Sequence, residues 1–136
     1  MSLSLPLLIG LGLAGLILWG LIARPNRQTV AARNLRIIDG DTLWIADQQG
    51  QILEKLRLAT IDAPETRGFK SLWQGRAGEA AKAALAQIIH RADEIEIVRV
   101  GYDRYGRTLV KLYDRQHSRH EIGAQMERAG YARHWD

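Results

Sequence analysis

Cysteine is absent from this sequence of 136 residues, and no charged residue precedes Arg24. The lack of cysteine excludes disulfide bonds and zinc sites built on thiolates. The formal net charge of +4 belongs entirely to the segment from Arg24 onward, and the sequence pI is about 9.8. Such a basic segment suits an anionic partner, which is either nucleic acid or a lipid surface.

The uncharged start of the chain is dominated by residues 3–23, a mostly aliphatic run of 21 residues. A helix of that length spans roughly 30 Å, the thickness of one hydrocarbon core. The run is longer than the ~7–15 apolar residues of a signal peptide, and no basic residue precedes it. We therefore expect residues 1–24 to be an uncleaved, single-pass membrane anchor rather than a signal peptide, with residues 3–23 in the lipid bilayer.

A polar segment, 25–33, follows and is interpreted as a linker, so the folded domain is expected to span residues 34–136. Apolar periodicity predicts five strands and two helices in this domain. The expected strands are 35–38, 42–46, 52–61, 94–100 and 108–113, and the expected helices are 76–90 and one that follows the capping box Ser118-x-x-Glu121 and ends near Ala129. Three strands, a helix and two more strands fit an α+β fold, the five-stranded OB barrel with packed helices.

The stretch Arg57–Glu65 contains the most informative group of polar residues. It begins as a strand and breaks into a turn at Pro64, which restricts the backbone on both sides. Two carboxylates, Asp62 and Glu65, are therefore held on stiff backbone downstream of a cation, Arg57. Alone, the same residues are equally consistent with a strand end followed by a solvated turn.

Two further segments could join this group in the fold. The segment Asp39–Thr42 brings two carboxylates close together, and such hard oxygen ligands suit Ca²⁺ or Mg²⁺. Neither acidic segment contains histidine, so zinc is disfavoured. The segment Asp103–Arg107 is a predicted turn with two arginines and a tyrosine. Basic and aromatic residues also alternate in the loop 66–75, where we expect Arg67 and Lys70 to contact a nucleic-acid partner.

These motifs, in this order, resemble the staphylococcal nuclease and thermonuclease family. The matching residues run as I-I-D-G-D-T-L, R-L-x-x-I-D-A-P-E-T, G-E-A-A-K and D-R-Y-G-R, and the resemblance covers residues 35–135. It implies an OB barrel and the calcium-dependent hydrolysis of phosphodiester bonds in DNA and RNA, with little sequence specificity. DNA and RNA would thus be the partners, and no obligate protein partner is implied.

The resemblance also implies a role for individual residues on the metal side of the site. Asp41 and Asp62 correspond to the carboxylates that bind calcium directly, and the backbone carbonyl of Ala63 to a further ligand. Glu65 corresponds to the glutamate beside the metal-bound water, generally assigned as the general base.

On the substrate side, Arg57 and Arg107 correspond to the two arginines that hold the scissile phosphate. Tyr105 corresponds to a tyrosine of the nucleotide-binding cleft, and Arg104 to a neighbouring position that is usually basic. This complete set of carboxylates and arginines favours an enzyme. The alternative is a catalytically inactive domain of the same fold that binds nucleic acid or protein at a membrane.

The expected side of the membrane depends on two opposing arguments. Arg24, Arg27 and Arg33 follow the apolar run, and the positive-inside rule then predicts a cytoplasmic domain. A calcium site with only two direct carboxylates is expected to be weak, with an affinity suited to extracellular calcium. Since relatives of this family are commonly exported, we favour an extracytoplasmic domain.

Overall fold

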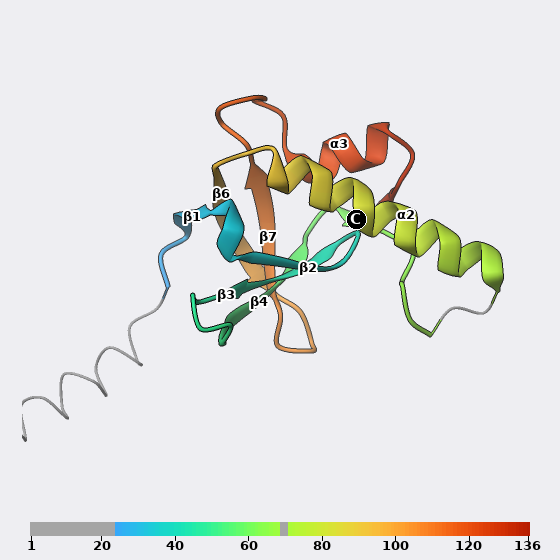
Figure 1. Ribbon diagram of the computed structural model, residues 1–136, viewed down its shortest axis with the longest axis horizontal. Coiled ribbons are helices and arrows are strands. Elements are labelled where there is room, and N and C mark those ends of the chain that lie inside the picture. The colour runs from blue at the N-terminus through green and yellow to red at the C-terminus, as the bar shows by residue number, and fades with distance from the viewer. Residues whose placement is uncertain (1–23, 69–70) are drawn as a thin grey trace, which may run out of the picture.

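Six strands form one sheet, in the order β1-β6-β7-β4-β3-β2, in the computed structural model, which describes residues 24–68 and 71–136 (Figure 1). The strands of this sheet are β1 (Arg27–Ala31), β2 (Leu35–Asp39), β3 (Thr42–Ala46), β4 (Ile52–Leu58), β6 (Glu94–Tyr102) and β7 (Thr108–Tyr113). The short strands β5 (Ile61–Asp62) and β8 (Arg133–His134) form a second, two-stranded sheet. The helical elements are η1 (Ala32–Asn34, a 3₁₀-helix), α2 (Leu72–His90) and α3 (Ile122–Arg128). The described part is thus a mixed fold, mostly of strands, with two α-helices.

The prediction that residues 25–33 form a linker is wrong, because residues 27–31 form a strand of the sheet. β1 pairs with β6 over five positions, from Arg27 opposite Val98 to Ala31 opposite Glu94. Its polar composition suits a strand at the end of the sheet, where only Val30 has to be buried. The sheet therefore has one strand more than the five that were predicted.

The two ends of the sheet are neighbours in the sequence. β1 and β2 stand at opposite ends of the strand order, yet only the three residues of η1 separate them. The two end strands must consequently lie close together, so the sheet is strongly curved. Helix α2 packs along β2 and η1 and covers this curved face (Figure 1).

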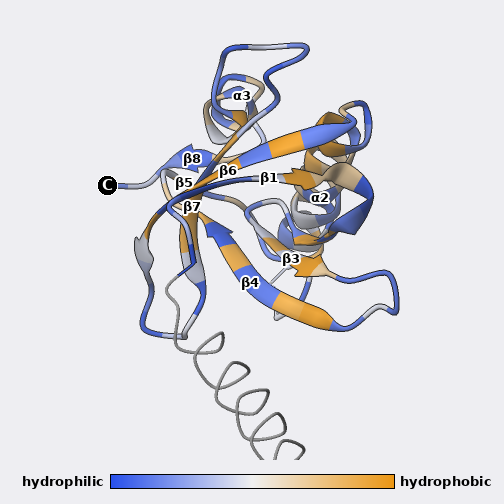
Figure 2. Ribbon diagram, turned by 90° about the vertical axis from the view of Figure 1, so that its left-hand side faces the viewer, coloured by the Kyte–Doolittle hydropathy of each residue, from blue (hydrophilic) through white to orange (hydrophobic). Residues whose placement is uncertain are grey.

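Strand β4 has the alternation that the sequence predicted, and Figure 2 shows apolar and polar residues succeeding one another along it. Leu56 and Leu58 are buried in the core, while Lys55 is exposed and Arg57 is partly exposed on the other face. The predicted strand 52–61 is interrupted after Leu58, and the chain resumes as β5 at Ile61.

A charged residue, Glu54, also lies on the buried face of β4. It accepts hydrogen bonds from Arg99 Nε and Nη2 at 3.0 and 2.6 Å and from the Thr108 hydroxyl at 2.7 Å. Arg99 in turn donates to the carbonyl of Pro25 and to the side chain of Gln28. Burial raises the pKa of Glu54, but the hydrogen bonds from Arg99 and Thr108 outweigh it and hold the pKa below its ordinary value. This network ties the start of the described chain to the sheet.

Both helices differ from the prediction at their first residue. Helix α2 begins at Leu72, earlier than expected, because the Ser71 hydroxyl accepts a hydrogen bond from the Gln74 amide and caps the helix. The predicted capping box at the start of α3 does not form. Glu121 is the N-cap instead, and its carboxylate accepts hydrogen bonds from the amides of Gly123 and Ala124. Ser118 caps nothing in α3, since its hydroxyl accepts from the His120 amide.

No helix within residues 24–68 and 71–136 is long and apolar enough to span a membrane. The predicted span at residues 3–23 lies outside the described residues.

Candidate functional site

Two neighbouring strands place the arginines that the sequence singled out. β4 and β7 pair in parallel, with Leu56 opposite Thr108 and Arg57 opposite Leu109. Arg107 immediately precedes β7, two residues before the partner of Arg57, so both arginines belong to the same face of the sheet. Both arginines line a cavity of about 620 Å³.

The same cavity contains the predicted nucleotide-contacting residues Arg104 and Tyr105. The Arg104 guanidinium donates to the Tyr105 hydroxyl at 2.7 Å and stacks on its ring, with 4.9 Å to the ring centroid. The Arg107 guanidinium lies 5.4 Å from the same centroid. The tyrosine ring is exposed and flanked by two cations, an arrangement that suits stacking of a base beside a phosphate.

Asp103, which the sequence analysis did not single out, orients Arg107. Its carboxylate accepts from Arg107 Nε at 2.6 Å and from the backbone amides of Tyr105 and Arg107. Burial raises the pKa of Asp103, but these hydrogen bonds outweigh it and lower the pKa below its ordinary value. The ion pair therefore holds the guanidinium of Arg107 in one position.

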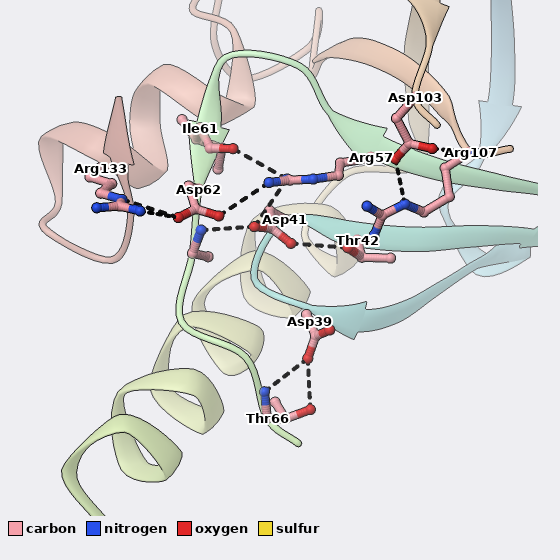
Figure 3. A network of polar contacts seen from close by, with 11 residues as sticks. Asp39, Asp41, Thr42, Arg57, Ile61, Asp62, Thr66, Asp103, Arg107 and Arg133 are labelled. Atoms are coloured by element: carbon pink, nitrogen blue, oxygen red, sulfur yellow. Dashed lines mark hydrogen bonds and ion pairs between the residues drawn. The ribbon is translucent and has the colours of Figure 1, made fainter. Parts of the chain in front are cut away.

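Arg57 is the centre of the polar network drawn in Figure 3. Its Nη1 lies 3.1 Å from Asp41 Oδ2 and donates to the carbonyl of Ile61, while its Nη2 lies 3.2 Å from Asp62 Oδ1. On its open side the guanidinium stacks on the ring of Trp135, 5.0 Å from the centroid. The structure thus brings the two predicted metal-binding carboxylates to the same arginine.

Asp41 is buried, and each oxygen of its carboxylate accepts a hydrogen bond. Oδ1 accepts from the Thr42 hydroxyl at 2.9 Å, and Oδ2 accepts from the Ala63 amide at 2.8 Å. The preceding residue must be glycine, because a Cβ at Gly40 would lie only 2.6 Å from the Cβ of Ala81 in α2. This close approach of helix and turn sets the position of Asp41.

Asp62 lies in β5, opposite Arg133 of β8. Its Oδ2 accepts from Arg133 Nε and Nη2 at 3.1 and 2.8 Å, so each of its oxygens contacts a different arginine (Figure 3). Neither Arg133 nor β8 was predicted, since a two-residue strand has no periodicity to detect.

Glu65 lines a second cavity, of about 650 Å³, together with Asp62. Its side chain is exposed and makes no hydrogen bond or ion pair within the described part of the chain. Its backbone is held firmly, because its carbonyl packs against Gly78 of α2, where any Cβ would overlap that oxygen. The next residue, Thr66, donates from its amide and hydroxyl to Asp39 at 3.1 and 2.6 Å (Figure 3). The loop thus presents a carboxylate with no ion-pair partner among residues 24–68 and 71–136, on an anchored backbone.

The predicted site residues therefore line two separate cavities rather than one, and Asp62 of the first contacts Arg57 of the second. Asp62, Ala63 and Glu65 line one cavity, the four residues Arg57, Arg104, Tyr105 and Arg107 line the other, and Asp41 is buried beneath Arg57. The structure does not bring Arg67 into either cavity, and its exposed side chain makes no hydrogen bond or ion pair within the described residues. Lys70 lies outside the described residues.

The oxygen atoms at this site suit a hard cation. Among the described residues, no group of three or more acidic, histidine or cysteine side chains forms a metal centre by itself. Asp41 and Asp62 nevertheless share one guanidinium, which shows that a positive charge is already favoured between them. Two carboxylates and a carbonyl would leave further positions of a six- to eight-coordinate Ca²⁺ to water or substrate.

Comparison with known proteins gives concordant matches. A family model described as staphylococcal nuclease homologue matches residues 55–136. An uncharacterized endonuclease of Haemophilus influenzae is 30% identical over 118 residues, which cover 86% of this chain and 59% of that protein. The micrococcal nuclease of Shigella flexneri is 39% identical over 80 residues, 58% of this chain and 40% of that protein. The thermonuclease of Staphylococcus hyicus is 32% identical over 92 residues, 68% of this chain and 52% of that protein. The chain therefore spans between 40% and 59% of the length of these relatives.

Proposed function

The chain belongs to the staphylococcal nuclease family, and on that basis we propose that it hydrolyses phosphodiester bonds of DNA and RNA with the help of calcium. The observation that carries this proposal is the convergence of Asp41 and Asp62 on Arg57, with Arg107 beside it. We also propose that the curved sheet is the five-stranded OB barrel of this family, with β1 and β2 as two halves of its first strand.

The two arginines would hold the scissile phosphate between them. A phosphodiester resists attack because its negative charge repels a nucleophile, and that charge grows on the equatorial oxygens in the transition state. Guanidinium groups stay protonated and bind two oxygens at once, so they stabilise this charge better than ammonium groups do. Their positions are set in advance, Arg57 by two carboxylates and Arg107 by Asp103.

Glu65 would act as the general base. A base must accept a proton from the attacking water, so its carboxylate has to be free of internal partners and open to solvent. Glu65 meets both conditions in the described part of the chain, on a backbone held by α2. Asp41, Asp62 and the carbonyl of Ala63 would hold the calcium ion, which supplies positive charge next to the phosphate and to the attacking water.

The experiment that tests this proposal is cleavage of labelled DNA and RNA by the full chain, with calcium or with a chelator. We expect cleavage of both nucleic acids in calcium and none after chelation. Glu65→Gln should lower the cleavage rate by about 10²–10⁴-fold while leaving the free energy of unfolding unchanged. Glu94→Gln, which removes the same charge from the exposed start of β6, is the matched control and should cleave normally.

The alternative, a domain that binds nucleic acid or protein without cutting, makes a different prediction in the same experiment. Binding of nucleic acid by the wild-type protein without any cleavage in calcium would support it and would contradict the enzyme. Wild-type rates in Glu65→Gln would instead leave the enzyme standing and remove Glu65 from the role of base.

A further inference from the structure

The carboxylate of Asp62 is shared by two arginines that differ strongly in their surroundings. Oδ1 contacts Arg57 at 3.2 Å, and Oδ2 accepts from Nε and Nη2 of Arg133 at 3.1 and 2.8 Å (Figure 3). The Arg57 side chain is 12% exposed, whereas that of Arg133 is 80% exposed. Arg57 is therefore embedded in the site, whereas Arg133 contacts Asp62 from the solvent side.

The contacts of the two arginines differ in the same way. Arg57 also contacts Asp41, the carbonyl of Ile61 and the ring of Trp135. The guanidinium of Arg133 contacts only Asp62 among the described residues. An ion pair with one exposed partner stabilises weakly, so it can be exchanged for another cation at small cost.

The backbone keeps Arg133 at this position whether or not its ion pair is formed. β8 pairs with β5 through Ile61 opposite His134 and Asp62 opposite Arg133, and the Trp135 amide donates to the carbonyl of Thr60. The side chain of Arg133 can thus leave Asp62 without β8 leaving β5. Because Arg133 also lines the cavity that contains Glu65, a released guanidinium stays beside that cavity.

We propose that Arg133 is a built-in competitor of the metal ion, a positioning residue that neutralises Asp62 in the metal-free protein and yields it when calcium binds. This inference rests on the proposed function, since it takes Asp62 as a metal ligand. Calcium and the Arg133 guanidinium would both bind the carboxylate of Asp62, so each would weaken the binding of the other. The competition lowers the affinity for calcium and keeps the carboxylate in place between turnovers.

The test is a calcium titration by isothermal calorimetry of the full chain in mild detergent, without nucleic acid. Arg133→Gln should bind calcium about two- to fivefold more tightly than the wild type, the range expected when an exposed ion pair is removed. Arg133→Lys, which retains the charge but only one point of contact, should lie between them. The matched control is Arg27→Gln, which removes an arginine of β1 that pairs with Glu96 of β6 at 2.8 Å. This variant should bind calcium like the wild type.

A second readout follows the arginine directly. In nuclear magnetic resonance spectra the Nε–Hε signal of Arg133 should shift at saturating calcium, and its exchange with water should accelerate, while that of Arg115, paired with Glu96, should stay unchanged. Equal calcium affinities of wild type and Arg133→Gln, or an unchanged Arg133 signal, would overturn the competition and leave the nuclease proposal intact. Absence of calcium binding in every variant would overturn both.

Discussion

Replacement of Arg57 by lysine should separate the chemistry of the site from the stability of the fold. The guanidinium contacts Asp41 at 3.1 Å, Asp62 at 3.2 Å and the carbonyl of Ile61 at 3.3 Å, and it stacks on Trp135. A lysine ammonium is a single point of charge, so it can approach one of the carboxylates but cannot span both and offer a fork to a phosphate.

The expected magnitudes follow from these contacts. Arg57→Lys leaves a positive charge near the buried Asp41, so the loss of stability should stay near 1–2 kcal/mol, within the range of ordinary substitutions. In contrast, Arg57→Gln removes the shared cation, and breaking a buried pair costs about 3–5 kcal/mol. Catalysis should suffer in both variants, because loss of one preorganised donor costs about 2.7–4 kcal/mol, or 10²–10³-fold in kcat.

Urea unfolding and single-turnover cleavage of labelled DNA at saturating calcium measure the two effects on the same samples. The reasoning predicts that the lysine variant remains folded but cleaves at least about 100-fold more slowly. A lysine variant within threefold of the wild-type rate would refute the two-point contact with phosphate.

Three further predictions concern the elements that support the site. Glu54→Ala should cost about 3–5 kcal/mol of stability in urea unfolding, because it leaves Arg99 buried without its carboxylate; Glu96→Ala, which breaks exposed pairs, should cost less than about 1 kcal/mol. Because the pKa of Glu54 in the folded protein lies below its ordinary value of 4.5, the ionised carboxylate stabilises the fold at pH values above 4.5. The free energy of unfolding of the wild type should therefore fall as the pH drops below 4.5, and it should fall less steeply in Glu54→Gln. Gly78→Ala should destabilise by about 1–3 kcal/mol and lower kcat, since the new methyl group displaces the backbone of Glu65; an unchanged kcat would contradict this support.

The local sequence pattern was sufficient to predict the strands that have a clear apolar run and clear ends. The ranges predicted for β3 and β7 agree with the structure, because a short, mostly apolar run ends at turn residues on both sides. It failed for β1, where a single buried valine, Val30, carries the apolar face of the strand. Glu54 was detectable in principle, since it lies two residues before Leu56 and therefore on the same face of β4.

The residues of the candidate site also differ in how well the local sequence predicts them. Arg57 and Asp62 were found together because a strand and a tight turn hold them close in the sequence. Asp103 carried a signal that went unused, since an aspartate at the start of a turn often accepts hydrogen bonds from the backbone amides that follow. Trp135 and Arg133 carried none, because the pairing of β8 with β5 depends on how the whole chain closes on itself.

The parallel pairing of β4 with β7 has a consequence for how this domain can be altered. The spacing between Arg57 and Arg107 is set by hydrogen bonds between adjacent strands, while the intervening chain makes a long excursion through α2 and β6. Insertions or deletions at exposed turns of that excursion would leave the two guanidinium groups in register. The length of this crossover can therefore vary and reshape the surface around the cavity while Arg57 and Arg107 keep their relative position.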